Sequence, residues 1–166
     1  MRKYGLMKGD QSGNEHLELE LSSNPTSDDI QVLRDGLHQF NLTASGRRYD
    51  GLPLAIWIRS GGRVLGGAYG YTHYGWLYLS LLWVDEALRG QGLGTQVVER
   101  FEAEGAARGC HAAWLDTYEF QAPTFYQRLG YQEFGRLEDF PPGSVRIFFW
   151  KPLQRAVRVA GAGRDS

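Results

Sequence analysis

The sequence has a single cysteine, Cys110, and only four histidines in 166 residues. One cysteine excludes an internal disulfide and a site built from several cysteines, and the scattered histidines form no metal-binding motif, so we predict no metal. The chain also lacks a surplus of charge, because 18 basic residues face 19 acidic ones. A general nucleic-acid-binding protein would show a basic surplus, and we therefore expect no nucleic-acid partner.

Long apolar runs are missing as well. No segment approaches the length that crosses a bilayer, and the first ten residues lack the apolar core of a signal peptide. These two absences predict a cytoplasmic protein with no membrane partner. What the chain does contain is 42% apolar residues, 13% aromatic residues and 22 glycines. This composition suits one well-filled core with many tight turns, so a single domain is the default.

The most informative stretch of the chain runs from Leu77 to Thr95. Residues 77–84 contain only one clearly polar side chain, Ser80, which is typical of a strand buried on both faces. The segment Arg89-Gly90-Gln91-Gly92-Leu93-Gly94 follows, and an amphipathic helix begins at once. Glycines let the backbone approach a ligand closely, and the N–H groups at the start of a helix favour a phosphate. The sequence therefore predicts a pyrophosphate site at this turn.

The other segments show strand and helix patterns in turn. Residues 1–15 and the tail 154–166 are polar or poor in large apolar residues, and we expect both to be poorly ordered. Between them, the patterns predict a strand at 16–21, a helix from about Thr26 to Asn41, a loop at 42–52, and strands at 54–59, 63–71 and 77–84. After the glycine turn they predict a helix ending before Gly109, a strand at 112–117, a short helix at 122–130, and strands at 131–135 and 144–151. In the longer of these two helices Val97 and Phe101 should face the core, and Glu102 should face water.

Two kinds of nucleotide-binding turn compete for residues 89–95. Gly90-x-Gly92 supplies the first half of the dinucleotide fingerprint, and Asp116 ends the next strand at about the right distance. Thr95, however, stands where that fingerprint needs a third glycine or alanine. The pattern Arg-x-x-Gly-x-Gly, residues 89–94, resembles instead the acyl-CoA pyrophosphate loop of the GCN5-related N-acetyltransferases (GNAT). An NAD-type dinucleotide-binding oxidoreductase is the less favoured alternative.

A second element adds to the resemblance to the GNAT family. Ala122-x-x-Phe125-Tyr126-x-x-x-Gly130-Tyr131 is similar to the family's A-x-x-(L/F)-Y-x-x-x-G-(F/Y), and the order of elements resembles the family fold over residues 17–153. The resemblance implies one α/β domain at residues 16–153 with the GNAT fold, a central mixed β-sheet flanked by helices. It also implies acetyl-CoA as a cosubstrate and acetyl transfer to a primary amine of a small molecule or peptide, by direct attack on the thioester.

The resemblance also assigns roles to individual residues. Backbone groups of Leu82, Trp83 and Val84 are expected to hold the acetyl carbonyl and the pantetheine arm. The pyrophosphate would be held by N–H groups of Arg89, Gly90, Gln91, Gly92, Leu93, Gly94 and Thr95. Tyr126 falls where the family places the general acid that protonates the leaving thiolate.

The general base is left open by the sequence. His73 and Glu119 are the nearest candidates along the chain, and Asp116 is a weaker one. A base that acts through water could not be recognised from the sequence. Glu119 stands where the family often has Asn, which puts that residue's usual contact in doubt. Asp116 is otherwise interpreted as a strand-end or acceptor-site carboxylate.

The sequence also leaves open which acceptor is used, whether the protein forms a homodimer, and whether it is catalytic. Residues 42–52 and 137–144 are the predicted walls of the acceptor pocket, but they fit small amines, antibiotics and peptide N-termini alike. Dimers are frequent in families of this kind, so a homodimer is one alternative. A non-catalytic acyl-CoA sensor on the same fold would bind acetyl-CoA without releasing thiol, although Tyr126 favours an enzyme.

Overall fold

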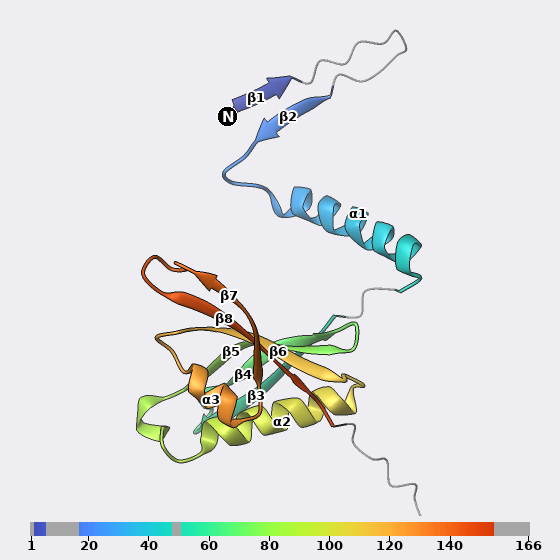
Figure 1. Cartoon of the computed structure of the whole chain (residues 1–166). Coiled ribbons are helices and arrows are strands. Elements are labelled where there is room, and N and C mark those ends of the chain that lie inside the picture. The colour runs from blue at the N-terminus through green and yellow to red at the C-terminus, as the bar shows by residue number, and fades with distance from the viewer. Residues whose placement is uncertain (1, 6–16, 48–50, 155–166) are drawn as a thin grey trace, which may run out of the picture. The chain divides into compact units, whose positions relative to one another are not determined.

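The computed structural model describes residues 2–5, 17–47 and 51–154, and the chain divides into two units, Met1–Arg48 and Tyr49–Ser166 (Figure 1). In the first unit, strand β1 (Arg2–Gly5) pairs antiparallel with β2 (Glu18–Leu21). β1 lies in a stretch for which the sequence predicts poor order. Its backbone pairs with the alternating strand β2, and such pairing does not require an apolar pattern in β1 itself.

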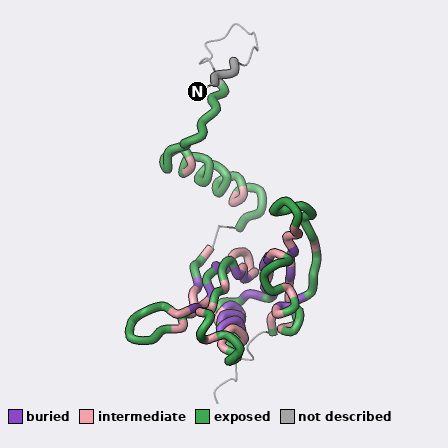
Figure 2. The backbone as a smooth tube through the Cα atoms, turned by 90° about the vertical axis from the view of Figure 1, so that its left-hand side faces the viewer, coloured by how far each residue is buried: buried purple, intermediate pink, exposed green. Residues whose placement is uncertain are grey.

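Helix α1 (Ser27–Ser45) completes the first unit, and local signals set its ends. The Thr26 hydroxyl accepts a hydrogen bond from the Asp29 N–H, and Gly46 closes the helix in the left-handed conformation. The helix therefore includes residues 42–45, which the sequence predicts as loop. No residue of α1 is buried, and Figure 2 shows almost the whole helix as exposed.

A six-stranded mixed sheet forms the second unit, with the strand order β3-β4-β5-β6-β8-β7. Its strands are β3 (Leu52–Ser60), β4 (Arg63–His73), β5 (Trp76–Val84), β6 (Ala112–Tyr118), β7 (Gln132–Glu138) and β8 (Val145–Pro152). β5 and β6 are parallel and all other neighbours are antiparallel. The predicted fold, a central mixed sheet with flanking helices, is confirmed. Within the described residues, no helix is long and apolar enough to cross a membrane.

Two helices pack on one face of the sheet. Helix α2 (Leu93–Ala107) connects β5 to β6, and the short helix α3 (Pro123–Arg128) follows β6 (Figure 1). Val97, Val98 and Phe101 of α2 are buried against the strands, which confirms the predicted inner face. A Cβ at Gly105 would lie 2.6 Å from Leu77 Cδ2, so this glycine lets α2 approach β5 closely.

The prediction that Glu102 faces water is wrong. Its side chain is buried, and Glu102 Oε2 accepts a hydrogen bond of 2.7 Å from Lys151 Nζ. Lys151 lies on β8, 49 residues further along the chain. The periodicity of the helix therefore cannot predict this contact. The carboxylate is buried here because a cation on a neighbouring strand pairs with it.

A β-bulge shapes the centre of the sheet. Tyr69 pairs with Leu81 and Gly70 with Leu79, so Ser80 is an extra residue on β5. A Cβ at Gly70 would lie 1.8 Å from the carbonyl oxygen of Tyr78, so only glycine allows the two strands to come this close. The bulge turns β5 away from β6 at the point where the site described below begins.

Candidate active site

The two parallel strands separate part-way along their length. β5 and β6 pair from Trp76 with Ala112 to Leu79 with Leu115. Beyond the bulge at Ser80, β5 pairs only with β4, while the last residues of β6 pair only with β8. The facing backbone groups of the two strands are therefore left for another partner.

A cleft of about 560 Å³ lies at this separation. Five of the predicted cofactor residues are on its wall: Leu82, Trp83, Val84, Arg89 and Gly94. The end of β6, the turn after it and α3 contribute others, among them Asp116, Thr117, Phe120, Gln121 and Tyr126. The remaining predicted residues, Gly90, Gln91, Gly92, Leu93 and Thr95, lie in the turn and the first turn of α2 but do not line the cleft.

The start of α2 has the features of an anion site. Gly92 precedes the helix with a φ of 75°, and no side chain caps the helix. The first intrahelical bond runs from Gln96 N–H to the Gly92 carbonyl, so the N–H groups of residues 93–95 have no acceptor within the helix. A Cβ at Gly90 or Gly92 would meet no atom within 4 Å, so the space beside the loop is open. These residues fit a pyrophosphate.

Tyr126 projects from α3 into the cleft lining, and most of its ring is buried. The ring packs near Tyr131 and Phe149, at centroid distances of 6.0 Å and 6.3 Å. Burial, with a smaller contribution from the charge of Asp116, raises the pKa of Tyr126 to about 12. The hydroxyl is therefore protonated at neutral pH and can donate a proton or a hydrogen bond.

The two predicted base candidates are not among the residues that line the cleft. His73 ends β4, opposite Trp76, and its ring centroid lies 4.1 Å from that of Tyr74. The Glu119 side chain is exposed in the turn after β6, where its backbone N–H donates to the Val145 carbonyl. Among the described residues, no group of three or more His, Cys, Asp or Glu side chains is placed to hold a metal ion.

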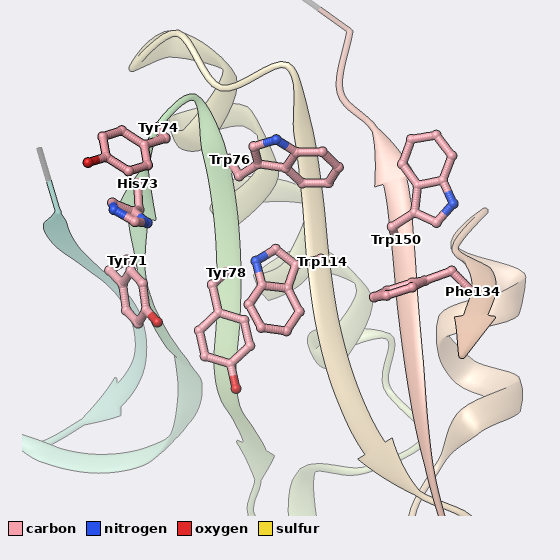
Figure 3. Close-up of a pocket in the computed structure, with 8 residues that line it drawn as sticks. All are labelled: Tyr71, His73, Tyr74, Trp76, Tyr78, Trp114, Phe134 and Trp150. Atoms are coloured by element: carbon pink, nitrogen blue, oxygen red, sulfur yellow. The ribbon is translucent and has the colours of Figure 1, made fainter. Parts of the chain in front are cut away.

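A second hollow, of about 790 Å³, is lined from β4, β5, β6, β7 and β8 and is almost entirely aromatic. Figure 3 shows its side chains side by side across the strands, with Tyr78 stacked beside Trp114 at 4.1 Å between ring centroids. Its lining residues are Tyr71, His73, Tyr74, Trp76, Tyr78, Trp114, Phe134 and Trp150. His73 therefore belongs to this aromatic surface.

A hydrogen-bonded group of three residues connects the aromatic surface with the cleft. The Tyr78 hydroxyl donates to Asp116 Oδ1 at 3.0 Å, and Arg146 Nε donates to Asp116 Oδ2 at 2.6 Å. Burial raises the pKa of Tyr78, and the charge of Asp116 raises it further. Sequence reasoning named Asp116 but missed its partners, because the three residues come from three strands and no local pattern joins them.

Gln121 is a further residue that sequence reasoning missed. Its Oε1 accepts hydrogen bonds from the Thr117 hydroxyl at 2.7 Å and from the Tyr118 N–H at 3.0 Å. The amide thereby closes the turn between β6 and α3, both of which contribute to the cleft. A polar residue four positions after a strand residue was the one available signal, and it is too common to identify this contact.

Comparison with known proteins identifies relatives of the whole arrangement. A sequence model described as the acetyltransferase (GNAT) family matches residues 16–131. Blasticidin-S acetyltransferase from Streptomyces morookaense is 43% identical over 93 residues, which are 55% of this chain and 68% of that protein. A crystal structure of an acetyltransferase from Agrobacterium tumefaciens has a TM-score of 0.76 and 34% identity, covering 82% of this chain and 99% of that one. Aminoglycoside 6'-N-acetyltransferase complexed with coenzyme A has a TM-score of 0.57 at 18% identity, covering 79% and 96%, and this likeness concerns the fold alone.

Proposed function

The chain belongs to the acetyltransferase (GNAT) family and is an acetyltransferase, and from this premise we propose that it transfers the acetyl group of acetyl-CoA to a primary amine. The acceptor is a small molecule or a peptide. The observation that carries the proposal is the cleft between β5 and β6, which joins the open start of α2 to a buried tyrosine. The two alternatives, an NAD-type oxidoreductase and a non-catalytic acyl-CoA sensor, have no support in the family match. We assign the activity to residues 16–153, most of which the family match covers.

Two parts of the chain hold acetyl-CoA in this proposal. The N–H groups of residues 89–95 bind the pyrophosphate, supported by the left-handed glycines and the uncapped start of α2. Backbone groups of Leu82 to Val84 bind the pantetheine arm and the acetyl carbonyl, supported by their position past the separation of β5 from β6. Bound acetyl-CoA supplies the thioester, and the protein holds it beside the acceptor. Such orientation can contribute roughly 7–11 kcal/mol to catalysis.

Tyr126 is the proton donor to the leaving group. The amine nitrogen forms a bond to the thioester carbon, the carbon–sulfur bond breaks, and the sulfur takes a proton from the Tyr126 hydroxyl. A pKa of about 12 supports this role, because the hydroxyl carries its proton at neutral pH. The amine loses a proton to water, which returns a proton to the tyrosine. His73 and Glu119 stay predictions for the base, and a base acting through water fits the cleft better because neither residue lines it.

The test measures thiol release from acetyl-CoA with a panel of amines, in the wild type and in Tyr126→Phe. The substitution keeps the ring and its packing, so acetyl-CoA binding should hardly change. Turnover with the best amine should fall by roughly 10²–10⁴-fold, the range for a general acid. Tyr131→Phe is the matched control, since Tyr131 is a buried neighbour that does not line the cleft.

Three outcomes would contradict the proposal or a part of it. No thiol release by the wild-type protein with any amine of the panel would refute N-acetyl transfer to amines. Equal turnover in the wild type and in Tyr126→Phe would refute only the role of Tyr126 as proton donor, and the acetyl transfer itself would stand. A fall of the same size in Tyr131→Phe would show that the loss comes from packing.

A further inference from the structure

Asp116 lies on the face of the sheet that α2 does not cover. The Leu77 side chain contacts α2 at Gly105, and successive residues of a strand point to opposite faces, so Tyr78 points away from α2. Asp116 Oδ1 accepts a hydrogen bond from the Tyr78 hydroxyl, which places the carboxylate on the same side as Tyr78. Tyr126, by contrast, packs on Phe149 in the core on the α2 side. Both Asp116 and Tyr126 line the cleft, so they flank it from opposite faces of the sheet.

The carboxylate is held in one orientation by groups from two strands. Arg146 places both Nε and Nη2 at 2.6 Å from Asp116 Oδ2. The guanidinium is itself enclosed by aromatic rings, with its Cζ 5.6 Å from the Tyr118 centroid and 5.2 Å from that of Phe140. The side chain of Asp116 is 11% exposed. Such a fixed, largely desolvated carboxylate needs no reorganisation to receive a ligand.

One hydrogen-bonding position of this carboxylate is available to a ligand. A carboxylate accepts about four hydrogen bonds, two on each oxygen. The two nitrogens of Arg146 occupy Oδ2, whereas within the described part of the chain Oδ1 accepts only from Tyr78. A purely structural ion pair would not need to reach a cleft wall, yet Asp116 does.

We propose that Asp116 binds the ammonium group of the acceptor and that Tyr78 and Arg146 position it. This inference rests on the proposed function and specifies its substrate class, an alkyl amine that is protonated at neutral pH. Amines of this kind have ordinary pKa values near 10, so they reach the enzyme as cations. Asp116 recognises that cation and holds its nitrogen at the separation of β5 and β6, facing the side that contains Tyr126.

Asp116 serves here as a binding group and not as the base. Both of its oxygens already accept hydrogen bonds, Oδ1 from Tyr78 and Oδ2 from Arg146, and these contacts fix the carboxylate in place to bind a cation. The ammonium proton passes to water before attack. The bound amine then forms the bond to the thioester carbon, the carbon–sulfur bond breaks, and Tyr126 protonates the sulfur as described above.

The experiment compares Asp116→Asn with the wild type, using the most active protonated amine of the panel and the alcohol that has a hydroxyl in place of its amino group. The KM of Asp116→Asn for the amine should rise about 10- to 100-fold, or about 1.4–2.8 kcal/mol at 1.4 kcal/mol per tenfold. This is the range of a hydrogen bond to a charged group. The inhibition constant of the uncharged alcohol, and the KM for acetyl-CoA, should stay within about twofold.

Two further variants separate recognition from structure. Glu104→Gln removes a carboxylate from another ion pair with an arginine, that of Glu104 on α2 with Arg108 directly after the helix, and should leave all of these constants unchanged. Tyr78→Phe keeps the ring stacked on Trp114 and should raise the KM for the amine a few-fold with little change in kcat. An unchanged KM for the amine in Asp116→Asn overturns the inference while the proposed function stands. A parallel rise in the alcohol's inhibition constant or in the KM for acetyl-CoA also overturns it, because a charge-specific contact would spare both. No thiol release by the wild type refutes the proposed function itself.

Discussion

Replacing Gly92 with valine tests the proposed anion site at the start of α2 most directly. Gly92 has a φ of 75°, and a Cβ there would meet no atom within 4 Å, so the change creates no clash within the chain. The folded state nevertheless loses about 1–2 kcal/mol, because a residue with a Cβ is strained in the left-handed conformation. For a chain of this size, that loss lowers the melting temperature by roughly 2–8 °C.

Acetyl-CoA should stabilise the wild-type protein but not this variant. At about 100 times its dissociation constant, a ligand that binds only the folded state adds about 2.7 kcal/mol. The melting temperature of the wild type should therefore rise by roughly 5–10 °C. In Gly92→Val the added methyl groups occupy the open space beside the loop, where a pyrophosphate must approach the backbone, so we expect no rise.

Gly109→Val provides the matched control at the other end of the same helix. Gly109 follows α2 with a φ of 90°, and a Cβ there also meets no atom within 4 Å. The strain is the same, so the melting temperature without ligand should fall by a similar amount. The full rise with acetyl-CoA should be retained, because residue 109 is remote in sequence from the loop and lines no part of the cleft.

Tryptophan fluorescence during heating is a suitable assay, because all five tryptophans lie in the sheet unit. The fluorescence signal therefore reports the unfolding of the sheet unit, independently of any change in the first unit. A full rise with acetyl-CoA in Gly92→Val would refute the argument that the pyrophosphate binds at this turn. Loss of the rise in both variants would show that strain at either helix end disturbs the cleft, and that result would refute the local explanation.

Two further predictions concern the stability of the sheet unit. Gly70→Ala should lower the free energy of unfolding by more than roughly 3 kcal/mol, because its Cβ would lie 1.8 Å from the Tyr78 carbonyl oxygen. Gly135→Ala, whose Cβ meets no atom within 4 Å, should cost less than about 0.5 kcal/mol, and equal urea midpoints would contradict this reasoning. Burial raises the pKa of Tyr126 from 10.0 to about 12 and raises that of Tyr131 as well. The contribution of these two tyrosines to the free energy of unfolding should therefore be fully present below pH 10 and fall between about pH 10 and 12. In the unfolded chain both tyrosines ionise first, so Tyr126→Phe and Tyr131→Phe should each reduce the fall, and an unchanged alkaline profile in both would refute it.

The sequence by itself determined the features that depend on neighbours along the chain. Gly90 and Gly92 take positive φ values that other residues rarely adopt, and the helix begins directly after them. The glycine turn and the start of α2 could therefore be predicted from their own residues. The apolar run at 77–84 and the motif around Tyr126 are equally local, and they led to the family resemblance that the comparisons confirm.

Only the tertiary structure decided which residues from different strands meet. Asp116, Tyr78 and Arg146 come from β6, β5 and β8, and their contacts depend on the strand order and on side chains that share one face of the sheet. Glu102 shows the same limit, because helical periodicity places it in water, whereas Lys151 from β8 allows it to be buried. Local conformation follows from sterics and hydrogen bonds between near neighbours, and the sequence records these. The pairing of distant charges follows from sheet register, which no short pattern in the sequence contains.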